Sequence, residues 1–142
     1  IFFMYSNEQT KMQGQTFGNE LKGIQDDLKK VTHSFDSKLS MFKEGSVDRE
    51  SFLEFAKKHE DEMSKIVSRY NSLQIPKGFL SAVDLFKLSS ETQFESDKQI
   101  IEWVKTDDDA AYIRSDALLQ DSFEYEMAAL AEYKLAQGQL NP

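Results

Sequence analysis

The side chains best suited to chemistry in this sequence are one histidine and a few polar residues that a helical fold can bring to one level. His59 falls on the apolar stripe of a predicted helix, and counting from the expected turns places it opposite Ser90, Glu91 and Glu124. Histidine with carboxylates between helices is the ligand set of carboxylate-bridged metal sites, which use a Glu-x-x-His pair on each of two helices. Ala56 stands where that glutamate is needed. We therefore interpret His59, Ser90, Glu91 and Glu124 as a buried polar layer that fixes how the helices align.

Two further groupings of metal-ligand types are incomplete. His59 and Met63 lie four residues apart on one helix face, a spacing at which soft ligands can hold Cu(I). Two ligands do not make a site, however, and a methionine on an apolar stripe is ordinary core filling. The run from Asp107 to Asp109 lacks the spacing of a calcium-binding loop and fits a solvated turn. The sequence therefore predicts no metal ion and no cofactor.

The familiar signatures of catalysis are missing from the sequence. It has no cysteine, only two histidines and no Gly-x-Ser-x-Gly motif, so nucleophilic catalysis has no support. It has no phosphate-binding loop and no dinucleotide fingerprint. The net charge of −8 disfavours binding to nucleic acid or to an anionic membrane surface, since both need a basic face. We expect a protein that is not an enzyme.

Charged residues near two apolar stripes admit two interpretations. Asp97 lies beside one stripe and Asp116 beside the next, with Lys98 and Arg114 close to them in sequence. The first interpretation is a set of surface ion pairs, each worth under ~1 kcal/mol. The second is a carboxylate that faces a small ligand held between helices, with Asp97 and Arg114 as the ligand-facing pair.

The elements that must position these residues are long helices. Four segments show the apolar spacing of three and four residues that is typical of amphipathic helices. They span, in round numbers, 8–43, 46–73, 79–104 and 109–134. Between them lie the helix-stopping residues Gly45 and Pro76 and the aspartates around Asp108. Because short links favour antiparallel neighbours, the sequence predicts one all-α domain over residues 8–142, an antiparallel four-helix bundle with a long N-terminal helix.

Two details of these helices are also predicted. Ser46 is expected to cap the second helix, and Gly138 is expected to end the fourth. The core stripe of the fourth helix is expected to consist of its large apolar residues. These are Tyr112, Ile113, Leu119, Phe123, Met127, Leu130 and Tyr133.

The N-terminal end is unusually apolar. We expect residues 1–7 to be the end of a membrane anchor or an apolar arm. No Lys or Arg precedes Lys11, which suits the non-cytoplasmic side of a membrane. The first helix is also the longest, so its end should contact a membrane, a protein partner or a second copy. The residues expected to make this contact are Ile1, Phe2, Phe3, Met4, Tyr5, Met12 and Phe17.

Four short runs in the second half of the chain carry a resemblance to known proteins. They are Leu85-Phe86-Lys87-Leu88-Ser89, Ser96-Asp97, Ile101-Glu102-Trp103 and Ser122-Phe123-Glu124-Tyr125-Glu126. With the helices around them, over residues 45–133, they resemble uncharacterised helical proteins of ammonia-oxidising archaea that are membrane-anchored and exported. The resemblance implies an exported bundle behind one N-terminal membrane helix. It also implies an accessory role beside a membrane enzyme such as ammonia monooxygenase, and it carries over no functional residues.

These observations favour one class of function and leave a second open. The favoured class is a non-enzymatic, extracytoplasmic accessory or scaffold subunit of a membrane-associated assembly. The alternative is a ligand-sensing four-helix bundle of the receptor-ectodomain type, which would bind a small molecule between its helices.

Overall fold

The computed structural model describes residues 2–140 and, within them, the side chains of residues 14–139. This part of the chain is all-α and contains no strand. Its elements are α1 (Phe2–Lys43), α2 (Arg49–Ser68), the 3-10 turn η1 (Arg69–Ser72), α3 (Leu80–Thr106) and α4 (Asp109–Leu140). The predicted all-α class is therefore confirmed.

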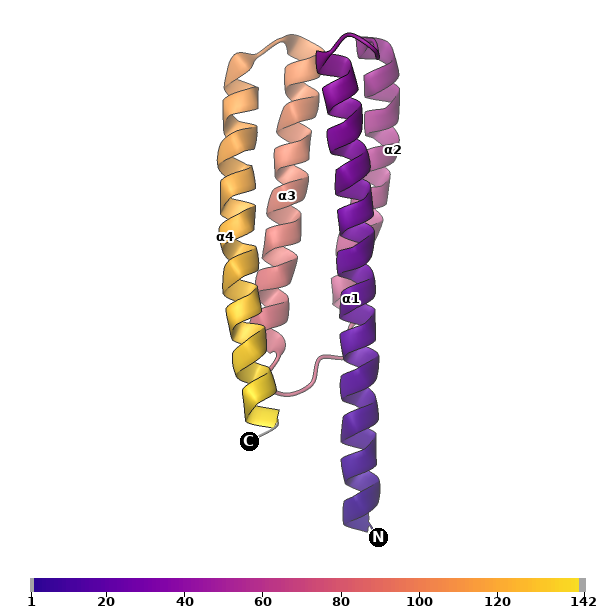
Figure 1. Cartoon of the computed structure of the whole chain (residues 1–142), viewed down its shortest axis with the longest axis vertical. Coiled ribbons are helices and arrows are strands. Elements are labelled where there is room, and N and C mark those ends of the chain that lie inside the picture. The colour runs from indigo at the N-terminus through magenta and orange to yellow at the C-terminus, as the bar shows by residue number, and fades with distance from the viewer. Residues whose placement is uncertain (1, 141–142) are drawn as a thin grey trace.

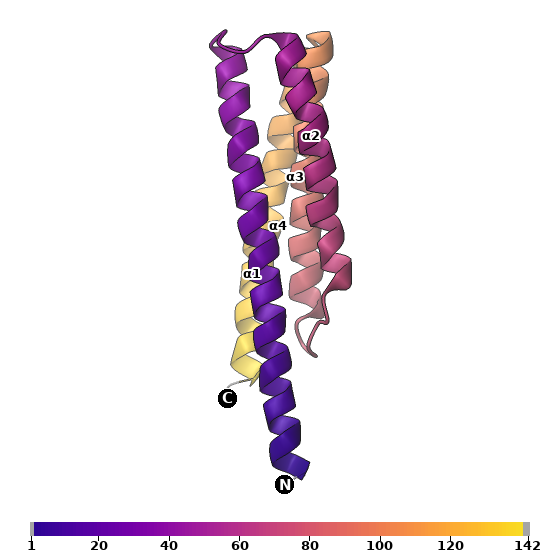
Figure 2. The ribbon, with the colours of Figure 1, turned by 90° about the vertical axis from the view of Figure 1, so that its right-hand side faces the viewer.

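Successive helices run in opposite directions along the long axis of the molecule (Figure 1). The α1–α2 and α3–α4 turns share one end, and the η1–α3 connection lies toward the other. The N-terminal part of α1 extends beyond the remaining helices in both side views (Figures 1 and 2). α1 begins at Phe2 rather than near residue 8, and α4 continues through Gly138 to Leu140. A glycine in the last turns costs at most about 1 kcal/mol, and Ala136 beside it stays buried, so the helix continues.

The turns between the helices use left-handed residues and one acidic cap. Gly45 has φ +86° after α1, and Asp107 has φ 59° after α3. α2 is capped by Asp48 rather than by Ser46, because the Asp48 carboxylate accepts the backbone N–H of Ser51 at 2.7 Å. That hydrogen bond lowers the pKa of Asp48. Ser46 instead donates its backbone N–H to the Met41 carbonyl and so closes the end of α1.

The apolar core is divided into two clusters. One lies toward the N-terminal end of α1, and its large buried side chains include Phe17, Leu21, Ile24, Tyr70, Phe79 and Phe86, while α4 contributes Ala129 and Ala136. The other lies toward the two shared turns and includes Phe35, Phe52, Ile100, Ile101 and Val104. Between the clusters lie the buried polar residues, which we call the polar waist: His59, Ser89, Ser90, Ser96, Asp97, Ser115 and Ser122. Every buried side-chain nitrogen or oxygen in the described part of the chain has a hydrogen-bond partner.

The α3–α4 pair packs through small residues that recur every seven positions. The α3 series is Ala82, Ser89 and Ser96, and the α4 series is Ser115, Ser122, Ala129 and Ala136. Small side chains let two helix backbones approach closely. Ser89 and Ser122 each donate their hydroxyl to the other's backbone carbonyl at 2.7 Å, and the Ser96 hydroxyl donates to the Ser115 carbonyl at 2.8 Å. The small residues of α4 therefore face the core. Of the large residues predicted to form its core stripe, Tyr112 and Tyr133 do pack against the two clusters. The prediction is wrong for the other five, which are exposed: Ile113, Leu119, Phe123, Met127 and Leu130.

Candidate functional site

The centre of the polar waist is a buried pair between α2 and α3. His59 Nε2 lies 2.7 Å from Asp97 Oδ2, and the side chains are 1% and 4% exposed. The Phe35 ring of α1 stacks on the imidazole with centroids 4.2 Å apart. Gln93, one turn before Asp97 on α3, donates its amide N–H to Asp97 Oδ1 at 3.1 Å. The pair is thus held from both sides and closed to solvent.

The predicted polar layer is only half right. His59 and Ser90 are buried, whereas Glu91 and Glu124 lie exposed on the surface. Ser90 donates to the Phe86 carbonyl at 3.0 Å, so the Tyr70 hydroxyl is the donor in its 2.9 Å contact with Ser90 Oγ. Both glutamates stay in water because burying an unpaired carboxylate is costly.

The ligand-facing pair expected from the sequence is not assembled. Asp97 points into the core toward His59. Arg114 is exposed on α4, where its Nε donates to Gln99 Oε1 at 2.8 Å and its Nη2 lies 3.5 Å from Asp108 Oδ2. Asp97 is instead the residue that sequence counting missed in the layer around His59. The signal was its place on the α3 stripe, seven residues after Ser90.

A groove of about 490 Å³ opens beside the polar waist, between α1, α3 and α4. Its apolar lining comes from Leu28, Phe86 and Leu130. Its polar lining includes Gln25, Lys29, Thr32, His33, Asp36, Tyr70, Ser89, Ser90, Gln93, Ser122 and Glu126. This mixture is suited to binding, because apolar walls supply contact area and a few polar groups supply orientation.

The groove is coupled electrostatically to the buried pair. Gln93 lines the groove and also holds the Asp97 carboxylate. Asp36 at the groove wall is partly exposed to solvent. Its partial burial raises its pKa, and the charge of Asp97 acts in the same direction, whereas His33 and His59 act against it. A cationic group placed in the groove beside Asp36 would therefore relieve an unfavourable carboxylate charge.

No group of three or more His, Asp or Glu side chains is placed to hold a metal ion anywhere in the described residues. His59 and Met63 are both fully buried in the core.

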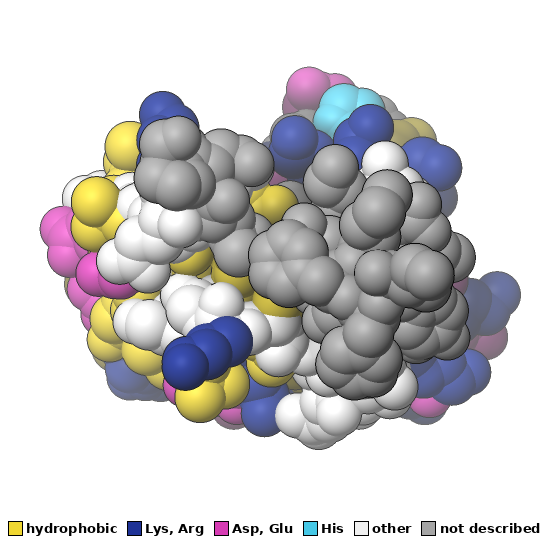
Figure 3. Space-filling model, turned by 90° about the horizontal axis from the view of Figure 1, so that it is seen from below, with side chains coloured by type: hydrophobic (Ala, Val, Ile, Leu, Met, Phe, Trp, Pro, Cys, Tyr) yellow, Lys and Arg dark blue, Asp and Glu magenta, His cyan; other side chains and the backbone are white. Residues whose placement is uncertain are grey.

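The outer face of α4 carries the large apolar residues that its small face displaces from the core. Four of them follow one another along the helix: Leu119 is 47% exposed, Phe123 58%, Met127 51% and Leu130 39%. We call these four residues the α4 apolar face. Leu130 also lines the groove, so the face and the groove are continuous. Seen from below, hydrophobic side chains lie exposed on the α3–α4 side of the molecule among acidic ones (Figure 3).

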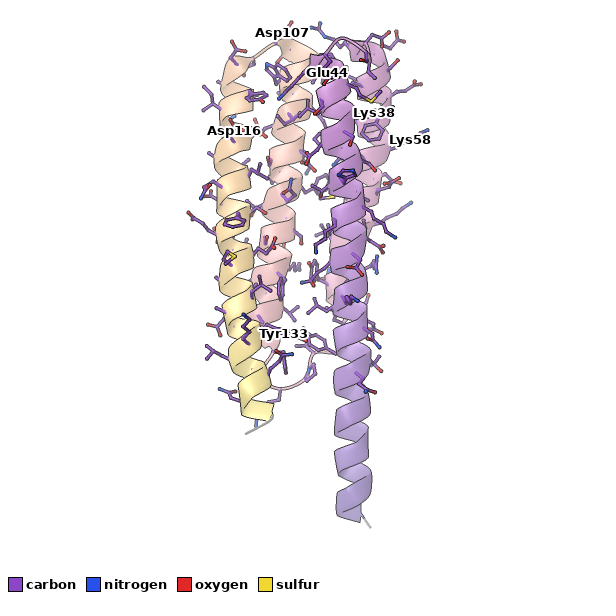
Figure 4. The ribbon with its side chains drawn as sticks, in the orientation of Figure 1. Lys38, Glu44, Lys58, Asp107, Asp116 and Tyr133 are labelled. Carbon is purple, nitrogen blue, oxygen red and sulfur yellow. The ribbon has the colours of Figure 1, made fainter. Side chains whose placement is uncertain are left out.

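The predicted N-terminal contact surface lies mostly outside the described side chains. Six of its seven residues have side chains outside the described ones: Ile1, Phe2, Phe3, Met4, Tyr5 and Met12. Phe17, the last residue of the predicted surface, is 3% exposed and packs on Phe79 with ring centroids 5.4 Å apart, so it belongs to the core. Tyr133 of α4 also packs on Phe79 and lies at this end of the molecule (Figure 4). Within the described residues, none of the helices combines the length and the apolar composition that crossing a membrane requires.

Comparison of the chain with protein-family models, with curated proteins and with solved structures found no match.

Proposed function

We propose that this chain is an antiparallel four-helix bundle that works as a non-enzymatic binding subunit, an accessory or scaffold part of a larger assembly. The observation that carries the proposal is the α4 apolar face. Its four side chains expose roughly 400 Å² together, which is within the size of the largest apolar patch on a typical monomer, and such patches are often functional. The core does not need these residues, because the small face of α4 already packs against α3.

The proposal places the assembly at a membrane, outside the cytoplasm. It is supported by the apolar residues Phe2, Phe3, Met4 and Tyr5 and by the resemblance to exported archaeal helical proteins. The same resemblance suggests a membrane enzyme such as ammonia monooxygenase as the assembly. Fractionation of native cells followed by protease accessibility tests the location. Recovery of the protein in the cytoplasmic fraction would contradict it.

The binding role is tested by replacing one residue of the α4 apolar face. Phe123→Glu places a charge at the middle of the face and should remove the protein from its native complex, as judged by native gel and mass spectrometry after extraction in mild detergent. Leu80→Glu is the matched control, because Leu80 is equally exposed, at 59%, but lies at the start of α3. The proposal fails if the complex survives Phe123→Glu or is lost equally in both variants.

A second function, small-molecule sensing, is favoured by the groove. Asp36 and Glu126 offer carboxylates, Tyr70 and Gln93 offer hydrogen bonds, and Leu28 offers an apolar wall. The ligand that fits this chemistry is a small amphipathic amine. Thermal shift against an amine panel tests it. A shift of several degrees with one amine, lost in Asp36→Asn, would support sensing over scaffolding.

A further inference from the structure

The outer face of α4 carries a seam with the spacing of a coiled coil. Its members follow one another at intervals of four, three, four, three and four residues: Asp116, Gln120, Phe123, Met127, Leu130 and Lys134. All of them are exposed. Alternating steps of three and four keep residues on one side of a helix that packs along another helix. A second helix laid along α4 would therefore meet every member of this seam.

The seam is symmetric about position 125. Phe123 and Met127 lie at equal distances on either side of that position, as do Gln120 and Leu130 at a larger distance, and Asp116 and Lys134 at the ends. If a second α4 is laid antiparallel and centred there, Phe123 of each copy faces Met127 of the other. Gln120 of each copy then faces Leu130 of the other, and Asp116 faces Lys134. Two apolar contacts therefore lie at the centre, and two opposite-charge pairs lie at the ends.

The charges select this orientation. Asp116 lies on the half of α4 nearer the α3–α4 turn (Figure 4), and Lys134 lies eighteen residues further on, about 27 Å away at ~1.5 Å per residue. Among the described residues, neither takes part in an ion pair within the chain. A parallel pairing would set Asp116 against Asp116 and Lys134 against Lys134. The antiparallel pairing replaces both repulsions with attractions.

The size of the surface fits a reversible dimer. The three apolar members of the seam contribute roughly 600 Å² from the two copies together, and its exposed polar members bring the total near the ~1,000 Å² that a specific interface needs. The seam is also self-complementary, which a twofold interface requires because the same patch is used by both subunits.

We propose that a second copy of this chain covers the α4 seam, giving a twofold-symmetric dimer in which the two α4 helices pack antiparallel. The proposal rests on the proposed function, since it names the partner that binds the α4 apolar face. Phe123 and Met127 form the centre of the interface, and Asp116 and Lys134 set its direction and register.

Charge reversal tests the proposed pairing directly, because a variant that merely misfolded would not be rescued by mixing with a second variant. Sedimentation equilibrium of the full chain in mild detergent should show a concentration-dependent dimer for the wild type. Asp116→Lys alone sets Lys against Lys134 twice, and Lys134→Asp alone sets Asp against Asp116 twice, so each should weaken the dimer by roughly tenfold or more. An equimolar mixture of the two variants makes both pairs attractive again and should restore the dimer as a heterodimer of the two chains.

Two further variants complete the design. Phe123→Glu should leave only monomer with an unchanged helical circular dichroism spectrum. Lys58→Asp, at an exposed position on α2, should dimerise like the wild type. The proposal is overturned if the wild type is monomeric at every concentration, or if the mixture of charge variants fails to regain the dimer. A wild-type monomer whose native complex is nevertheless lost in Phe123→Glu would show that another protein covers the face, leaving the proposed function intact.

Discussion

At the scale of single residues, the His59–Asp97 pair forms the buried polar contact between α2 and α3. Both side chains are buried, and each has the other as a partner. A buried polar pair of this kind fixes the alignment of α2 and α3, because any shift of either helix would leave a polar group unpaired. The pair adds little net stability over apolar residues of similar volume, but removing one member is costly.

This balance predicts strong coupling between the two residues. Asp97→Ala leaves the His59 imidazole unpaired and should lower the free energy of unfolding by about 2–4 kcal/mol. Replacing both His59 and Asp97 by leucine should cost less than the sum of the two single leucine replacements. Urea denaturation of the wild type, the two single leucine variants and the double leucine variant measures the difference. As a control, Glu91→Ala on the exposed side of α3 should change stability by under about 0.5 kcal/mol. Additive costs would show that the two residues act independently.

Asp36 makes the stability depend on pH in a predictable direction. Its pKa in the folded chain is raised from the ordinary 3.8 by burial and by Asp97. The folded state therefore binds the proton more tightly than the unfolded state, so this group costs stability as pH rises above 3.8. Asp36→Asn should be more stable than the wild type at pH 7, and the advantage should vanish below pH 3.8. Thermal melts from pH 3 to pH 7 measure it, with Asp26→Asn on the same helix as control. If Asp36→Asn is more stable than the wild type by the same amount at every pH, the raised pKa of Asp36 is not the cause.

At the scale of the elements, the close packing of α3 on α4 determines which residues reach solvent. The buried positions between the two helices include serines and alanines, and three of the serines donate a hydrogen bond to a backbone carbonyl of the opposite helix. A large side chain there cannot be accommodated without separating the helices.

Ser89→Leu should therefore lower the free energy of unfolding by about 1–3 kcal/mol, because it inserts a large side chain between the α3 and α4 backbones. Ser81→Leu provides the matched control, since Ser81 lies on α3 but is exposed. Chemical denaturation followed by circular dichroism compares the two variants. Equal midpoints would mean that α3 and α4 do not approach each other at Ser89.

The helices were predictable from the sequence, whereas the orientation of α4 was not. Apolar spacing and the stop signals at Gly45, Pro76 and Asp108 place the breaks between helices within a few residues. For α4, large apolar residues on one face and small ones on another compete for the core. Hydrophobicity alone favours Phe123 and Met127, whereas close packing favours Ser122 and Ala129. Small residues recur every seven positions on both α3 and α4, and this pattern indicates that the small face of α4 packs toward the core.

The candidate site was predictable only in part, for a similar reason. The place of His59 on an apolar stripe identified it as a core histidine, and its burial follows. Its partner was mistaken, because counting residues from the turns placed Ser90 and Glu91 at the level of His59, whereas Asp97, six residues after Glu91, reaches it. The groove depends on the spacing between α1 and α4, which no property of either helix alone determines.

At the scale of the whole molecule, a hydrogen-bonded polar interior is combined with an exposed apolar surface on α4. The polar waist holds α2, α3 and α4 in one alignment, and the small-residue packing of α4 turns its large residues outward. The molecule is therefore built to present the α4 apolar face, and a partner is expected to cover it.

The rate of methionine oxidation tests this central claim most directly, because three methionines act as internal reporters. Met127 lies in the α4 apolar face at 51% exposure, Met41 lies elsewhere on the surface at 39%, and Met63 is fully buried. Dilute protein treated with peroxide should show rapid oxidation of Met127 and Met41 and slow oxidation of Met63. As protein concentration or native partner is increased, Met127 should become protected while Met41 stays reactive. The account is contradicted if Met127 is as slow as Met63 at every dilution, or if Met127 and Met41 remain equally reactive under all conditions.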